Sequence, residues 1–99
     1  HAKDTAIDSW NSPVNGNLDI VPYTDMTKRS WLFRTVGYGH GYEVWKDMVS
    51  ALRLVGYDYV LSIEHEDALT SIDEGFGKAV DFLKQVVLEE TMEAAWWTD

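Results

Sequence analysis

The sequence predicts an α/β protein built as one right-handed βαβα unit, and three observations support this fold class. Residues 59–63 form a short, almost continuously apolar run, as in a strand that is covered on both faces. Residues 42–55 and 71–88 repeat apolar side chains at helical spacing. Residues 1–5 have the character of a strand end. The two strands are therefore expected to lie side by side and parallel.

A long connection separates the first strand from the first helix. Residues 6–41 show no helical periodicity, and connections of this length usually serve as lids or binding loops. Residues 18–22 and 31–36 are rich in β-branched and aromatic side chains, which favour strands. The connection is therefore expected to be a long loop or to contain a small hairpin between these two segments.

Both predicted helices have recognisable end signals. Gly56 follows the helix at 42–55, where a residue in the left-handed conformation commonly ends a helix. Ser71 and Glu74 form a capping box at the start of the second helix, which continues to about residue 88. The side chains expected to be buried are Val44, Trp45, Met48, Val49, Leu52 and Val55 in the first helix, and Phe76, Ala79, Val80, Leu83, Val86 and Val87 in the second.

Composition narrows the class of protein. The chain has 99 residues, 45% of them hydrophobic, so it holds at most one globular domain. Asp and Glu number 17 against 8 Lys and Arg, and the net charge of −9 would repel a nucleic acid. No apolar run is long enough to cross a membrane. The chain has no Cys, which excludes disulfides and thiolate metal sites and is compatible with a cytoplasmic location.

The start of the chain suggests a piece of a larger protein. It begins at His1, without an initiator Met, and we interpret residues 1–99 as the C-terminal fragment of a single larger domain. Two parallel strands alone would leave unpaired edges. We therefore expect the missing N-terminal part, or other copies of the same chain, to cover those edges.

The most informative stretch is the run Glu64-His65-Glu66-Asp67, which follows the second predicted strand directly. Ligands and chemistry in α/β proteins lie beyond the carboxyl ends of parallel strands. If the two strands are neighbours, His1 and Glu64 meet at that edge. One imidazole and one carboxylate make half of a common divalent-metal site. The alternative is that both are ordinary solvent-exposed groups.

Five spaced motifs carry a resemblance to a known family. They are His1-Ala-Lys-Asp-Thr, Arg34-Thr-Val-Gly-Tyr-Gly-His-Gly, the helix with Trp45, Gly56-Tyr-Asp-Tyr and Ile63-Glu-His-Glu-Asp. Together they resemble the last two βα units of a (β/α)₈ TIM barrel, strands 7 and 8 with their helices. The family is that of the xylose-isomerase-like sugar phosphate isomerases and epimerases. The resemblance covers roughly residues 1–88.

The resemblance implies a divalent metal, Mn, Mg, Co or Zn, held by residues from four strands. His1 and Glu64 match the ligands of the seventh and eighth strands, and the other two ligands would precede residue 1. Glu64 would also be an acid–base group that moves a proton next to the carbonyl of a sugar or sugar phosphate, through an enediolate.

Two alternatives to the isomerase or epimerase stay open. The same metal and base could serve a dehydratase of a sugar or cyclic polyol. A chain of 99 residues is about 40% of the roughly 250 that a TIM barrel needs, so this chain alone could be an inactive, self-associating fragment. An endonuclease of the same superfamily is disfavoured by the net charge.

Three residues are candidate substrate contacts. Arg34 could bind a substrate oxygen or phosphate, and its alternative role is a surface salt bridge. His65 and Glu66 could line the pocket, and their alternative role is to form hydrogen bonds within the loop.

Two further residues lie beside His1 in the sequence. Asp4 could orient the His1 ring from behind, as carboxylates commonly do for metal-ligating histidines. Lys3 is expected to be a solvated charge. The glycine-rich stretch at 37–41 superficially suggests a phosphate loop but is interpreted as a flexible turn.

Overall fold

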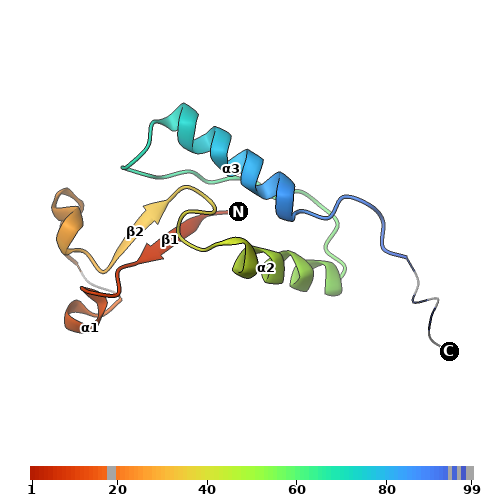
Figure 1. Cartoon of the computed structure of the whole chain (residues 1–99), viewed down its shortest axis with the longest axis horizontal. Coiled ribbons are helices and arrows are strands. Elements are labelled where there is room, and N and C mark those ends of the chain that lie inside the picture. The colour runs from red at the N-terminus through yellow and green to blue at the C-terminus, as the bar shows by residue number, and fades with distance from the viewer. Residues whose placement is uncertain (18–19, 94, 96, 98–99) are drawn as a thin grey trace.

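The computed structural model of the chain describes residues 1–17, 20–93, 95 and 97, and places six short elements along them (Figure 1). The elements are β1 (Asp4–Ile7), α1 (Ser12–Asn15), the 3₁₀ helix η1 (Tyr23–Lys28), β2 (Trp31–Arg34), α2 (Tyr42–Leu54) and α3 (Ile72–Val86).

The sheet differs from the predicted one. β1 and β2 form a two-stranded antiparallel sheet, with Asp4 opposite Arg34 and Ile7 opposite Trp31. Residues 59–63 form no strand; only Ile63 pairs, in a single parallel bridge with Ala2. The prediction of two parallel βα units from a TIM barrel is therefore wrong for the described residues. Sustained strand structure requires a backbone partner along its whole length, and residues 59–61 have none among the described residues.

The predicted hairpin is also wrong. Residues 20–22 are not in a strand, and Leu18 and Asp19 lie outside the described residues. The aromatic-rich segment at 31–34 does become a strand, but its partner is β1. The reason is that the chain turns back through α1 and η1, which places β2 beside the strand where the connection began.

Both long helices are confirmed, nearly to the residue. α2 ends in a Schellman motif, in which Gly56 has a φ of 83° and donates to the carbonyl of Arg53, while Tyr57 donates to that of Leu52. Ser71 caps α3 by accepting a hydrogen bond of 3.1 Å from the Glu74 amide. Within the described part of the chain, no helix has the length and apolar character needed to cross a membrane.

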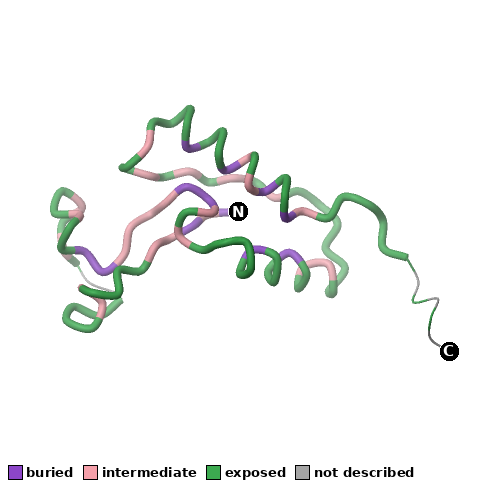
Figure 2. The backbone as a smooth tube through the Cα atoms, viewed as in Figure 1, coloured by how far each residue is buried: buried purple, intermediate pink, exposed green. Residues whose placement is uncertain are grey.

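A small core lies between α2 and α3, around the first residues of the chain (Figure 2). Its buried members are Ala2, Val36, Trp45, Val49, Ala79, Leu83 and Val86. The rest of each predicted apolar face is exposed to solvent. Its exposed side chains are Val44, Met48, Val55 and Phe76. The radius of gyration is 16.7 Å, against about 13 Å for a compact domain of 100 residues. The described residues therefore cover only part of their own apolar surface.

Candidate metal and acid–base site

The parallel bridge brings together two predicted site residues that are far apart in the sequence. Ala2 donates to the carbonyl of Ser62 at 2.6 Å and accepts from the Glu64 amide at 3.0 Å. These two bonds fix the backbones on either side of the bridge. As a result, His1 Nδ1 lies 2.8 Å from Glu64 Oε2. Both side chains face solvent, with 70% of the His1 side chain and 45% of the Glu64 side chain exposed.

The distance between His1 Nδ1 and Glu64 Oε2 suits two neighbouring ligand atoms on one cation. Two donors that each lie about 2.1 Å from a metal, at a right angle to one another, are about 3 Å apart. Imidazole nitrogen and carboxylate oxygen are ligands for Zn²⁺, Mn²⁺ and related cations. The described residues contain no group of three or more potential ligand side chains. The pair therefore supplies an edge of a metal site and needs further ligands.

Lys3 joins this pair to Glu66. Its Nζ lies 3.1 Å from Glu64 Oε1 and 3.1 Å from Glu66 Oε1, and 3.9 Å from the centre of the Phe33 ring. Hydrogen bonds to Glu66 and then to Glu64 raise the pKa of Lys3 above its usual value. This role of Lys3 was not predicted from the sequence, although the alternation of an extended chain places residues 1 and 3, and residues 64 and 66, on common faces. His1, Lys3, Glu64 and Glu66 are called the exposed cluster below.

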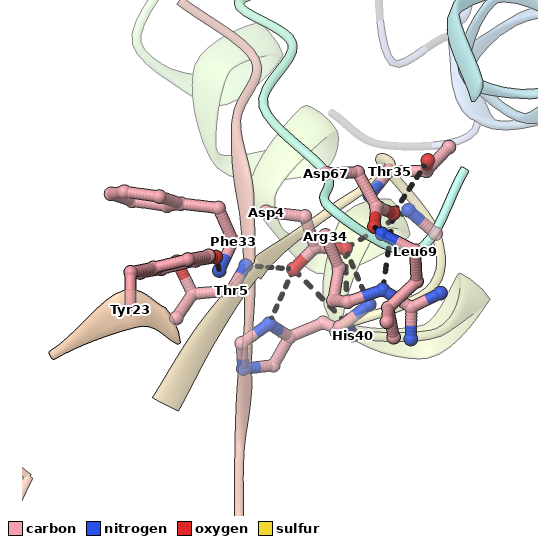
Figure 3. Close-up of polar contacts among 11 residues, drawn as sticks. Asp4, Thr5, Tyr23, Phe33, Arg34, Thr35, His40, Asp67 and Leu69 are labelled. Atoms are coloured by element: carbon pink, nitrogen blue, oxygen red, sulfur yellow. Dashed lines mark hydrogen bonds and ion pairs between the residues drawn. The ribbon is translucent and has the colours of Figure 1, made fainter. Parts of the chain in front are cut away.

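Asp4 points away from the exposed cluster and is almost fully buried, with 2% of its surface accessible. The sequence predicts that Asp4 orients His1, but none of its hydrogen bonds in the described part of the chain reaches His1. Its carboxylate accepts instead from the backbone of the glycine-rich loop and the His40 ring (Figure 3), and from the Trp45 ring. The donors are the amides of Thr5, Gly37, Gly39 and His40, His40 Nδ1 and Trp45 Nε1, at 2.8 to 3.2 Å.

These contacts explain the glycine-rich stretch, which wraps a carboxylate of the chain itself. Burial alone would raise the pKa of Asp4, but the hydrogen bonds from His40, Gly37 and Thr5 outweigh it and lower the pKa. A Cβ added at Gly39 would overlap Asp4 and the Thr5 carbonyl. Gly39 is therefore required by the close approach of the loop to Asp4.

Asp67 plays the same part for the end of β2, and its side chain is fully buried. It accepts from Arg34 Nε at 3.0 Å, from the Thr35 amide at 2.7 Å and from the Leu69 amide at 2.8 Å (Figure 3). Burial raises and these hydrogen bonds lower the pKa of Asp67, with a net decrease. Arg34 thus has an internal partner, and a contact between Arg34 and substrate stays a prediction.

His65 lies apart from the other predicted site residues. A Cβ built at Gly75 would come within 2.5 Å of His65 Cε1, so the ring packs against the first turn of α3. The ionisable run at 64–67 is therefore divided between two sides. Glu64 and Glu66 join the exposed cluster, whereas His65 and Asp67 pack inside.

A groove of about 410 Å³ lies elsewhere, between the end of α2 and residues 87–92. Leu52, Tyr57, Leu61 and Met92 contribute apolar surface to it. Arg53 donates to the carbonyls of Leu88 and Glu90, which ties residues 88–90 to α2. None of the predicted site residues lines this groove.

The comparisons with known proteins identify one relative by sequence. The chain is 36% identical over 87 residues to the uncharacterized protein YfiH of Bacillus subtilis (strain 168). The match covers 88% of this chain but only 28% of the relative. No protein-family model matches the chain. No solved structure matches it either. The chain therefore corresponds to a little over a quarter of the relative's length.

Proposed function

We propose that this chain is part of a divalent-metal-dependent isomerase or epimerase that acts on a sugar or sugar phosphate. The observation that carries the proposal is the contact of 2.8 Å between His1 Nδ1 and Glu64 Oε2, two donors separated by 63 positions in the sequence. Their atom types and spacing suit one cation. The resemblance of the motifs around them to xylose-isomerase-like enzymes supports the choice of reaction.

Each residue of the pair has a distinct role in this proposal. His1 would hold the cation through a ring nitrogen, and Glu64 would hold it through its carboxylate and also accept a proton from the carbon next to the substrate carbonyl. The loss of that proton converts the hydroxycarbonyl unit into an enediolate. The return of a proton to the other face, or to the neighbouring carbon, gives the epimer or isomer. The cation, when bound, supplies positive charge that favours the negatively charged enediolate oxygens.

The remaining ligands and the second acid–base group come, in this proposal, from other parts of a longer protein. The exposed apolar side chains of α2 and α3 and the large radius of gyration support a covering partner. A second copy of this chain is the alternative source. We further propose a cytoplasmic location, with which the absence of Cys is compatible.

The test is solvent proton exchange catalysed by a longer protein that contains this segment. The protein is incubated in D₂O with Mn²⁺ and a panel of ketoses and their phosphates. Deuterium should enter next to the carbonyl, and Glu64→Gln should reduce the rate by a factor of about 10² or more. The matched control is Glu89→Gln, which changes an exposed glutamate far from the exposed cluster in the sequence. Full exchange in the Glu64→Gln variant would refute the role of Glu64.

A further inference from the structure

Lys3 divides the two oxygens of Glu64 between different partners. Lys3 Nζ contacts Oε1 at 3.1 Å, whereas His1 Nδ1 contacts Oε2 at 2.8 Å. The same ammonium group also contacts Glu66 at 3.1 Å. Two carboxylates and one lysine therefore form a compact group with only one oxygen of Glu64 directed toward His1.

The ammonium group of Lys3 packs against Phe33, which belongs to an aromatic cluster with Trp31 and Tyr23. Phe33 lies 3.9 Å beneath Lys3 Nζ, and an ammonium group over a ring face is attracted electrostatically. Trp31 contacts the Phe33 ring edge to face, with ring centres 4.8 Å apart, and Tyr23 stacks on the Phe33 ring with ring centres 6.4 Å apart. The Tyr23 hydroxyl also accepts a hydrogen bond of 3.0 Å from the Phe33 amide.

The exposed fractions of the side chains agree with this arrangement. Only 24% of the Lys3 side chain is exposed, against 45% for Glu64 and 57% for Glu66. Lys3 is therefore more buried than the two carboxylates that it contacts, and it also packs against an aromatic ring. The aromatic residues of η1 and β2 fix the lysine, and the lysine fixes Glu64.

We propose that Lys3 is a positioning residue that assigns the two oxygens of Glu64. Its ammonium group pairs both with Oε1 of Glu64 and with Glu66. Oε2 of Glu64 is then left facing His1 as the one oxygen available to a cation. This inference rests on the proposed function for the cation, but the orientation of Glu64 is independent of it. Without Lys3, Glu64 and Glu66 would offer a pair of free carboxylates, and a cation would no longer depend on His1.

The first test uses the metal-free chain. Three-bond couplings measured by NMR report whether the Glu64 side chain occupies one rotamer. We expect a single rotamer in the wild type and in Lys3→Arg, and averaging in Lys3→Met, which keeps the methylene groups over Phe33. Lys84→Met is the matched control on the exposed face of α3. The same couplings in Lys3→Met and the wild type would overturn the positioning role.

The second test measures Mn²⁺ affinity by calorimetry in a cycle of variants of a longer protein that contains this segment. His1→Gln should weaken binding roughly tenfold or more in the wild type and in the Lys3→Arg background. In the Lys3→Met background, His1→Gln should change the affinity by less than about twofold, since Glu64 and Glu66 then bind the cation themselves. An equal loss in both backgrounds would overturn the assignment of oxygens.

The two tests separate the possible failures. A longer wild-type protein that contains this segment and binds no Mn²⁺ would count against the proposed function, while the couplings in the metal-free chain would still decide the role of Lys3. Circular dichroism of each variant confirms folding. If Lys3→Met does not fold, Glu66→Gln releases the lysine from one partner and should shift the Glu64 couplings in the same direction by a smaller amount. Unchanged Glu64 couplings in Glu66→Gln would then overturn the proposal.

Discussion

The acids of the two bridged segments, residues 1–4 and 64–67, lie in two opposite settings. Asp4 and Asp67 are buried, and each accepts hydrogen bonds from several donors of the surrounding loops. Glu64 and Glu66 lie on the exposed side, where Glu64 pairs with His1 and Lys3, and Glu66 pairs with Lys3. The oxygens of the buried acids accept hydrogen bonds from the surrounding loops, whereas the oxygens of the exposed acids stay accessible to solvent.

The difference separates structural from chemical roles. A carboxylate surrounded by backbone amides is held as an anion and cannot take up a cation or a proton without disrupting its loop. A carboxylate with half of its side chain exposed can exchange partners at little cost. We therefore expect changes at Asp4 and Asp67 to alter stability, and changes at Glu64 to alter binding.

The largest effect should come from Asp4→Asn. The substitution keeps the shape of the side chain but turns an NH₂ group toward backbone amides that need an acceptor. Removing one partner of a buried charged interaction lowers the free energy of unfolding by about 3–5 kcal/mol. Urea unfolding followed by Trp fluorescence measures the change, since Trp45 donates to Asp4. The matched comparison is Glu64→Gln, which we expect to change stability by less than about 0.5 kcal/mol.

Equal destabilisation in the two variants would break the comparison, because it would mean that the burial of Asp4 does not matter. A stable Asp4→Asn variant would also show that the loop at 37–41 does not depend on the carboxylate.

The second effect is a loss of stability in acid. The pKa values of Asp4 and Asp67 are lowered in the folded chain, whereas unfolded aspartate has its usual pKa near 3.8. The stabilisation is therefore complete above that pKa and declines as the pH falls toward the folded values, because the unfolded chain binds protons first. Urea midpoints between pH 6 and pH 2 should fall less steeply for Asp67→Asn than for the wild type. Parallel curves would contradict the assignment.

A third, smaller effect separates two glycines in the first turns of α3. A Cβ at Gly75 would lie 2.5 Å from both His65 Cε1 and Thr70 Oγ1, whereas a Cβ at Gly77 meets nothing within 4 Å. Gly75→Ala should therefore destabilise the chain by about 1–3 kcal/mol through overpacking. Gly77→Ala should stabilise it by about 0.5–1 kcal/mol through helix propensity. Thermal melts of the two variants give the comparison, and a stabilising Gly75→Ala would show that His65 does not pack there.

Local signals in the sequence were sufficient for the helices. The apolar spacing of α2, Gly56 after it and the Ser71 cap of α3 each depend on residues within one or two helical turns. The strands could not be predicted in the same way. A β-prone segment such as β2 pairs with whichever edge the chain brings beside it, and that depends on the path through α1 and η1.

The candidate site was partly accessible from the sequence. His1 and Glu64 could be placed together because strand ends meet at one edge, and the single bridge at Ala2 is enough to achieve it. The contacts of Lys3 with Phe33 and of Asp4 with the loop could not be predicted, because a charge next to a predicted ligand has no preferred partner in sequence alone. Their partners, Phe33 and the loop at 37–41, belong to the connection, whose path the sequence did not determine.

The most direct test of the proposed cation site is a calorimetric titration of a longer protein that contains this segment with Mn²⁺, Mg²⁺, Co²⁺ and Zn²⁺, beside its Glu64→Gln variant. We expect saturable binding of at least one of these cations, at a ratio of about one per chain or per pair of chains, and a loss of roughly tenfold or more in affinity in the variant. Identical titrations of the wild type and the variant, or no binding of any of the four cations, would contradict a site built on His1 and Glu64.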